Sequence, residues 1–272
     1  MTEFAFDEQA SRNLEAVYLT PDVVAQRRQV LEALHLAPGE RVIDIGSGPG
    51  LLASEMAAVV GETGRVCGVD PSAAMVAIAS RRCAAQPWVE FRAGSALELP
   101  YPDAGFDLAV STQVLEFVAD IPGALAEIRR ILRPGGRVAI LDTDYGSLVI
   151  QTDDPARMAR VLDAWDEHFV HPHLPRMLGS ELRRAGFALR QAASIPMFNA
   201  EYRDDTYAKG MLKMIAAFAP GRRGVSQAEA DAWVAEFAEL DAEGRFFFSI
   251  NRYLFIAEKQ PLPDARGSEP RA

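Results

Sequence analysis

The sequence predicts an α/β protein built on a doubly wound, largely parallel sheet. Five short apolar runs follow one another between residues 41 and 142, and segments with helical patterning separate them. Strands that alternate with helices at this spacing form βαβ units, which build parallel sheets. The runs are apolar on both faces, as expected for strands that helices cover on either side.

The composition excludes several other classes of protein. The chain has 272 residues, of which 49% are hydrophobic and 24% charged, as in ordinary globular proteins. It holds no stretch of ~18 uncharged apolar residues, and its first residues do not resemble a secretory signal. We therefore expect a cytoplasmic protein with no membrane partner. A net charge of −10 makes nucleic acid an unexpected partner.

The chain before the first apolar run predicts one helix, over about 20–34. Thr20, Pro21 and Asp22 supply a hydroxyl cap, a proline at the first helical position and an acid in the first turn. Pro38-Gly39 then breaks the chain. The five apolar runs are predicted strands, at 41–46, 65–70, 89–92, 106–111 and 137–142. Helical patterns separate them at about 50–60, 72–85 and 120–132.

The rest of the chain is less regular. Residues 154–168 and 176–185 predict helices, and 187–198 and 245–259 predict strands. Two further helical patterns lie between those strands, at about 206–219 and 227–240. The last residues, 261–272, hold three prolines and little apolar content, so we expect a disordered tail.

The strongest chemical signal is a glycine-rich turn, Val42–Gly50, between a strand and a helix. Glycines let a backbone approach a ligand closely, and the helix N-terminus behind them favours a polar ligand group. Asp70 ends the next strand, where an acid can accept two ribose hydroxyls. A dinucleotide site requires the motif G-x-G-x-x-G. Here Leu51 stands where the third glycine of that motif belongs, which disfavours a nicotinamide-dependent oxidoreductase. A tight turn with no ligand is the remaining alternative.

These segments resemble the class I S-adenosylmethionine-dependent methyltransferases, in their small-molecule branch. Four stretches match that family in order: 42–50, 69–72, 94–100, and 106–118 together with 132–137. The resemblance implies a Rossmann-like sheet of seven strands, mostly parallel with the last strand antiparallel, to which helical lid insertions are added. The two late strands would complete this sheet.

The resemblance also implies S-adenosylmethionine as the cofactor. Asp44 and the glycines would line its methionine end, Asp70 its ribose and Ser95 its adenine. Two positions depart from the family: Ser95 replaces the usual aspartate, and Glu116-Phe117 replaces a frequent Glu-His. The predicted cofactor-binding residues are Tyr18, Asp44, Gly46, Ser47, Gly48, Gly50, Asp70, Pro71, Met75, Gly94, Ser95, Ala96, Thr112, Gln113 and Val114.

Methyl transfer from a sulfonium is an in-line displacement that depends mainly on positioning, so a base is needed only for an acidic acceptor. His171 lies in a histidine-rich loop, and Asp144 and Tyr145 follow the fifth strand; these three are the candidate catalytic residues. Each could equally be a solvated polar group. His171 and its neighbours could also suggest a metal, but neither they nor Cys67 and Cys83 have a ligand pattern, so we expect no metal site.

The domain prediction follows the family. Residues 1–40 would form an N-terminal helical lid segment. Residues 41–260 would form the methyltransferase domain, with insertions at about 143–175 and 200–244 that cover the acceptor.

The predicted function is methyl transfer to a small, partly apolar organic acceptor. The alternatives are a macromolecular (protein or RNA) methyltransferase, an oxidoreductase, and a cofactor-binding protein without transfer activity. The sequence carries no signal for an oligomeric state.

Overall fold

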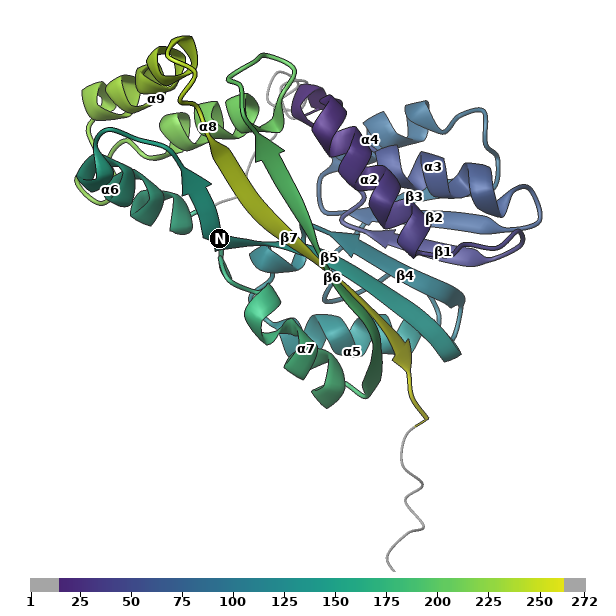
Figure 1. Cartoon of the computed structure of the whole chain (residues 1–272). Coiled ribbons are helices and arrows are strands. Elements are labelled where there is room, and N and C mark those ends of the chain that lie inside the picture. Colours follow the sequence, from purple (N-terminus) through teal and green to yellow (C-terminus); the bar gives the residue numbers. More distant parts are fainter. Residues whose placement is uncertain (1–14, 262–272) are drawn as a thin grey trace, which may run out of the picture.

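In the computed structural model, which describes residues 15–261, seven strands form one sheet with helices on both faces (Figure 1). The strand order is β3-β2-β1-β4-β5-β7-β6. The first five strands are parallel, and β7 runs antiparallel to both of its neighbours, so the predicted fold class is confirmed. The strands are β1 (Arg41–Ile45), β2 (Arg65–Asp70), β3 (Val89–Ala93), β4 (Phe106–Thr112), β5 (Leu132–Ile150), β6 (Phe187–Asn199) and β7 (Phe248–Lys259).

Helices cover the two faces of the sheet separately. On one face lie α2 (Pro21–Ala33), α3 (Leu51–Val60) and α4 (Ala73–Arg82), and on the other lie α5 (Ile121–Ile131) and α7 (Pro175–Arg184). Successive residues of a strand pack against opposite helix layers: Val42 packs on the α3 side of the sheet and Ile43 on the α5 side. This two-sided burial explains why the first strands are apolar runs without alternation. A short 3-10 turn, η1 (Leu115–Phe117), follows β4.

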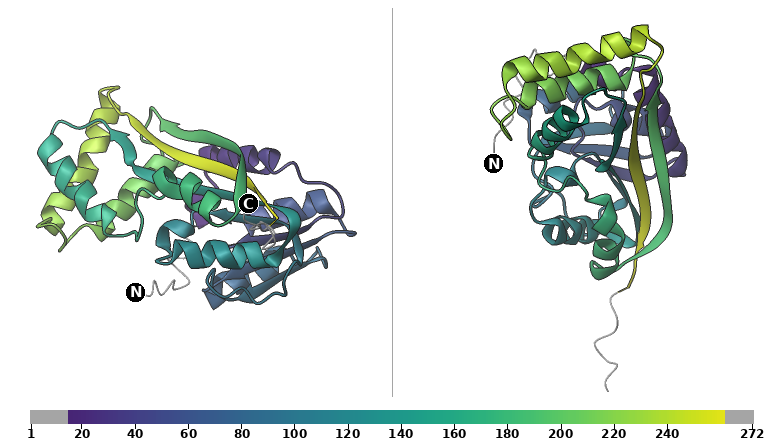
Figure 2. Two further views of the ribbon diagram at one scale, coloured as in Figure 1. Left: turned by 90° about the horizontal axis from the view of Figure 1, so that it is seen from below. Right: turned by 60° about the vertical axis from the view of Figure 1, so that its left-hand side comes forward.

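Strands β5, β6 and β7 continue beyond the carboxyl edge of the parallel strands (Figures 1 and 2). The sequence predicts β5 only over 137–142, but it extends to Ile150, because β7 continues to pair with it at Val149 and Ile150 after an irregularity. The extension carries three helices, which we call the cap: α6 (Pro155–Asp166), α8 (Tyr207–Phe218) and α9 (Gln227–Ala242).

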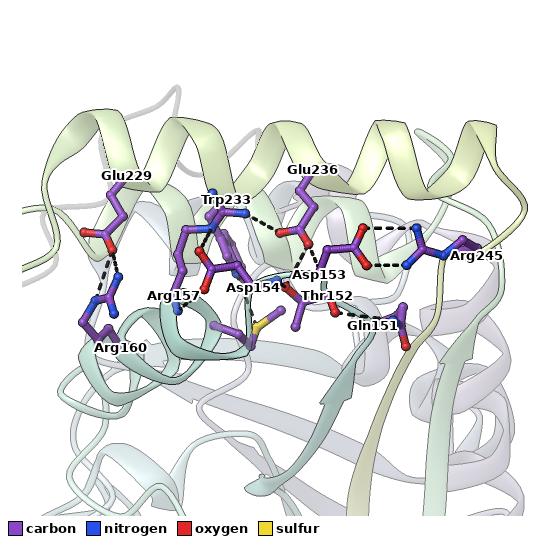
Figure 3. Close-up of polar contacts among 11 residues, drawn as sticks. Gln151, Thr152, Asp153, Asp154, Arg157, Arg160, Glu229, Trp233, Glu236 and Arg245 are labelled. Atoms are coloured by element: carbon purple, nitrogen blue, oxygen red, sulfur yellow. Dashed lines mark hydrogen bonds and ion pairs between the residues drawn. The ribbon is translucent and has the colours of Figure 1, made fainter.

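The cap has its own apolar core. Trp233, Phe237, Leu212 and Val161 are fully buried in it. Outside that core, polar contacts join α6 to α9 (Figure 3). The buried carboxylate of Glu236 accepts hydrogen bonds from Arg157 Nη2 at 2.7 Å, from the Thr152 hydroxyl at 2.9 Å and from the Asp153 amide.

The two predicted insertions contain these helices: 143–175 includes α6, and 200–244 includes α8 and α9. Of the predicted lid segment, residues 15–40 are described and contain α2. The expected tail lies, apart from Pro261, outside the described residues. Within residues 15–261, no helix is both long enough and apolar enough to cross a membrane.

Candidate functional site

The glycine turn between β1 and α3 forms the base of the site. Gly46, Gly48 and Gly50 all have positive φ, at 71°, 51° and 77°. A Cβ on Gly46 would lie 2.2 Å from Val114 Cγ2, so packing of the chain itself requires glycine there. At Gly48 a Cβ would meet no described atom within 4 Å, so this glycine faces open space.

Asp70 connects this turn to the end of β2. Its Oδ2 accepts a hydrogen bond from the Gly48 amide at 2.8 Å, and its Oδ1 accepts one from the Ser72 amide at 2.9 Å. Burial raises the pKa of the carboxyl group, and the two amides oppose that shift. Each carboxylate oxygen has a second lone pair, so Asp70 can hold the turn and still accept from a ligand.

A cleft opens between this turn and the N-terminal helical segment. Tyr18, Gln26 and Arg27 line one side, and Thr112 at the end of β4 and Gln113 after it also line the cleft. The other wall comes from Asp44, Gly46, Ser47, Gly48 and their neighbours. Gln113 has a φ of 56°, a left-handed conformation that costs a non-glycine residue energy, and such positions concentrate at functional sites. Arg27 fixes the helix over the cleft through an ion pair with Glu55 at 2.8 Å.

The cleft contains two polar atoms that need partners. Among residues 15–261, neither Asp44 Oδ1 nor Ser47 Oγ has a hydrogen-bond partner, although both are buried. Burial, together with nearby Asp70, raises the pKa of Asp44 to about 7. Unsatisfied buried acceptors are uncommon and costly, and an ammonium group would satisfy both. The cleft therefore fits the amino-acid end of a ligand such as S-adenosylmethionine.

The predicted adenine-side residues lie at the ends of β2 and β3. The Gly94 amide donates to the Asp70 carbonyl at 3.2 Å, which places the two segments side by side. Ser95 is exposed, and its Oγ accepts from the Leu97 amide at 3.1 Å. Ala96 and Met75 are buried, whereas Pro71 is exposed. This group is adjacent to Asp70 but does not line the cleft.

The three candidate catalytic residues separate in the structure. The Tyr145 hydroxyl donates to Glu116 Oε1 at 3.3 Å, and its ring stacks on Phe169 with centroids 3.9 Å apart. The His171 amide donates to the Glu116 carbonyl. Asp144 instead contacts His173 Nδ1 at 3.0 Å and Arg176 Nε at 2.8 Å, which joins β5 to the start of α7. Tyr145 and His171 thus lie near one another, whereas the side-chain contacts of Asp144 are with the segment that begins α7.

Three further buried charged residues lie in this region, of which Asp142, at the end of the predicted fifth strand, is a sequence-based candidate beside Asp144 and Tyr145. Glu116 is almost fully buried, and burial raises its pKa to about 7 against the opposing Thr143 amide, Arg252 and Tyr145. Asp142 accepts from the Val114 amide at 3.1 Å, and burial and Glu116 raise its pKa. Arg252 reaches the same region from β7. Buried and half-buried residues alternate along β7. The sequence signal that could have identified Arg252 is a charged residue at one of the positions that this alternation buries.

The comparisons with known proteins agree with this geometry. A family model described as "Methyltransferase domain" matches residues 43–140. An uncharacterised 37.1 kDa protein of a Streptomyces fradiae transposon is 33% identical over 258 residues, which cover 91% of this chain and 71% of that protein. A 2-phytyl-1,4-naphtoquinone methyltransferase of Synechococcus elongatus is 44% identical over 108 residues, or 39% of this chain and 46% of the relative.

The chain belongs to the class I S-adenosylmethionine-dependent methyltransferase family. A demethylmenaquinone methyltransferase of Symbiobacterium thermophilum is also similar, with 38% identity over 42% of this chain and 47% of the relative. The chain thus spans about half the length of these two quinone methyltransferases. Membership makes S-adenosylmethionine its cofactor, which confirms the cofactor that the resemblance implies.

Solved structures share the fold of this methyltransferase. Phosphoethanolamine N-methyltransferase 2 from Haemonchus contortus superposes with a TM-score of 0.62 at 19% identity, over 95% of this chain and 59% of that chain. The YcgJ protein from Bacillus subtilis superposes with a TM-score of 0.60 at 21% identity, over 88% and 100%. At these identities the likeness concerns the fold alone.

Proposed function

We propose that this methyltransferase transfers a methyl group to a small, partly apolar organic acceptor by in-line displacement. The observation that carries the proposal is the position of Tyr18. Its side chain lines the cleft that holds the unsatisfied Asp44 and Ser47 atoms, and it also packs against the aromatic core of the cap. One residue therefore borders both the cofactor cleft and a covered apolar region.

On the cofactor side, the chain's own polar groups bind and orient S-adenosylmethionine. Asp44 and Ser47 accept from an ammonium group, Asp70 accepts from ribose hydroxyls, and Gly48 leaves the space open. The bound cofactor supplies an electrophilic methyl group on a sulfonium. Water exclusion by Tyr18 and α2 and collinear placement of the acceptor supply most of the remaining catalysis.

On the acceptor side, a buried aromatic cluster with few polar groups lies between the cap and β5. Tyr145, Trp165 and Phe169 contact one another, and Phe218 of α8 packs on Trp165 with ring centroids 5.5 Å apart. Pockets for small ligands combine such apolar walls with a few placed polar groups, here the Tyr145 hydroxyl and Glu116. The quinone acceptors named for two relatives support an apolar acceptor. A net charge of −10 argues against RNA.

The test is transfer of a tritiated methyl group from S-adenosylmethionine to three pools: small phenols, hydroxyquinones and amines; bulk RNA; and bulk protein. We expect label in the small-molecule fraction. Asp44→Asn should abolish or strongly reduce it, whereas Arg203→Met, a change at an exposed ion pair, should not. Label confined to RNA or protein would contradict the proposal.

Tyr145→Phe tests the acceptor side separately. It removes one hydroxyl and keeps the stacked ring, so we expect a higher acceptor KM or lower kcat with little change in the dissociation constant of S-adenosylhomocysteine. Loss of cofactor binding with unaltered acceptor kinetics would place Tyr145 on the cofactor side instead.

A further inference from the structure

We propose that Arg252 determines acceptor specificity by binding an anionic oxygen of the acceptor, either a carboxylate or the oxygen of an ionised phenol or enol. The inference rests on the proposed function and narrows its substrate class. Two polar residues support it, one in β7 and one in α2. Each occupies a buried position at which its strand or helix otherwise carries apolar residues.

The first of these residues is Arg252 itself. In β7 the buried positions alternate with half-buried ones, and Phe248, Ile250 and Leu254 occupy the buried positions around it. Arg252 takes the middle position of this series and is only 1% exposed. A strand register that points one charged side chain into an apolar interior is costly, so a compensating interaction is expected.

The second residue is Gln26 of α2. The buried stripe of this helix consists of Val23, Gln26 and Val30, so a side-chain amide stands between two valines. Arg252 Nη1 donates a hydrogen bond to Gln26 Oε1. The two exceptions to the apolar pattern, 226 residues apart in the chain, therefore meet each other.

The guanidinium group retains unused hydrogen-bonding capacity. Among residues 15–261, Arg252 forms no ion pair, and its buried Nε has no hydrogen-bond partner. The ring of Tyr207 at the start of α8 covers it, with the guanidinium carbon 4.6 Å from the ring centroid. Because arginine carries a charge at physiological pH, this buried cation is compensated only in part, by a neutral amide, an aromatic face and the nearby Glu116 carboxyl group.

Arg252 also lies where the acceptor-covering segments meet. Its charge is within electrostatic reach of Tyr18 before α2, Glu116 after β4 and Tyr145 in β5, and its contacts reach α2 and α8. A buried guanidinium at this junction, without an ion-pair partner in the described part of the chain, suits a planar anionic group, which it can bind through two parallel hydrogen bonds.

The experiment measures binding to the protein saturated with S-adenosylhomocysteine, by calorimetry with two matched pairs of probes. Benzoate is compared with benzamide, and 2-hydroxy-1,4-naphthoquinone, which is an anion at neutral pH, with 1,4-naphthoquinone. We expect at least one anion to bind tenfold or more tightly than its neutral match. A preference for benzoate over benzamide would indicate a site for a carboxylate. A preference for the hydroxyquinone anion over 1,4-naphthoquinone would indicate a site for an enolate.

The variants assign that preference to a residue. Arg252→Met keeps the length of the side chain without its charge and should abolish the preference. Arg252→Lys keeps a buried cation and should retain part of it, which covers the case in which the methionine variant does not fold. Arg203→Met removes an exposed cation that pairs with Glu201 and Asp205, and it should leave the preference unchanged.

Equal binding of anions and neutral probes by the wild-type protein would overturn the inference, and so would a preference that survives in Arg252→Met. Failure of the proposed function looks different. In that case no small molecule accepts label in the tritium assay, whatever the binding experiment shows. If neutral small molecules accept the labelled methyl group and the protein shows no preference for anions, the proposed function is supported. Only the role proposed for Arg252 is then contradicted.

Discussion

The glycine-turn region and the cap both bury polar groups, but they stabilise them differently. Around the turn, the partners are backbone amides: Asp70 accepts from Ser72, two residues away, and from Gly48, 22 residues away in the glycine turn. In the cap, Glu236 binds Arg157, 79 residues away, mostly through side chains. A region built from a glycine turn and backbone amides at strand ends leaves a motif in the sequence, whereas one built from distant side chains does not. The difference can be tested by changing each region separately.

The largest effect is expected in the core of the cap. Trp233 is fully buried between helices, and Trp233→Ala should reduce the free energy of unfolding by about 3–5 kcal/mol through lost burial and a cavity. Chemical denaturation would measure this. If the two regions are independent, methyl transfer should fall while the affinity for S-adenosylhomocysteine barely changes. A parallel loss of cofactor affinity would show that the cap supports the cleft.

The next effect concerns the contacts between α6 and α9 shown in Figure 3. Glu236→Gln leaves Arg157 and the Asp153 amide with a weaker acceptor, so unfolding should require about 1.5–3 kcal/mol less. Glu229→Gln is the matched control on the same helix, because its ion pair with Arg160 is exposed and should contribute nothing measurable. Equal destabilisation by both variants would mean that burial does not determine the strength of these contacts.

In the glycine-turn region, Asp70→Asn should act on binding more than on folding. The change removes the charged acceptor for ribose hydroxyls and replaces one acceptor oxygen by a donor. We expect S-adenosylhomocysteine to bind more weakly by about 1.5–3 kcal/mol, measured by calorimetry. An unchanged dissociation constant would remove Asp70 from the predicted cofactor site.

The smallest effect is a pH dependence carried by Asp44, whose pKa burial raises to about 7. Between its ordinary pKa and this value, the folded chain holds a proton that the unfolded chain has lost. Folding stability from this group therefore decreases as pH rises through that window. Cofactor binding has the opposite sign, because an ammonium group favours the ionised carboxylate.

The affinity for S-adenosylhomocysteine should thus increase with pH, by up to about tenfold per unit below pH ~7, and level off above it. Calorimetry at about pH 6, 7 and 8 would measure the slope, and Asp44→Asn should flatten it. A slope that persists in this variant would assign the titration to another buried acid such as Glu116, whose pKa burial also raises to about 7.

Most of the fold could be predicted because its signals are local. Proline and acid at 21–22, the cap at Ser72 and the glycines at 46–50 each fix a boundary through neighbouring residues. The length of β5 could not be predicted, because residues 143–150 become strand only through pairing with β7, more than 90 positions away.

The site follows the same rule. The acids Asp44 and Asp70 end strands beside a recognisable turn, so position alone identifies them. Glu116 and Arg252 are notable for their burial, and Arg252 counteracts the raised pKa of Glu116, which no short stretch of sequence encodes. Asp144 occupies a position that looks catalytic, yet its contacts with His173 and Arg176 are determined by how α7 docks.

The continuation of β5, β6 and β7 into the cap has a mechanical consequence. Donor and acceptor sites on separate bodies joined by a flexible linker would have to find their alignment anew in every turnover. Here the antiparallel pairing of β6 with β7 runs from Lys259 to Phe248, with one irregularity between Leu189 and Gln191, and joins the two regions. The spacing between them is therefore set by backbone hydrogen bonds rather than by loop conformation. The proposed displacement requires three atoms in line, and the sheet would set the distance between the regions that hold them.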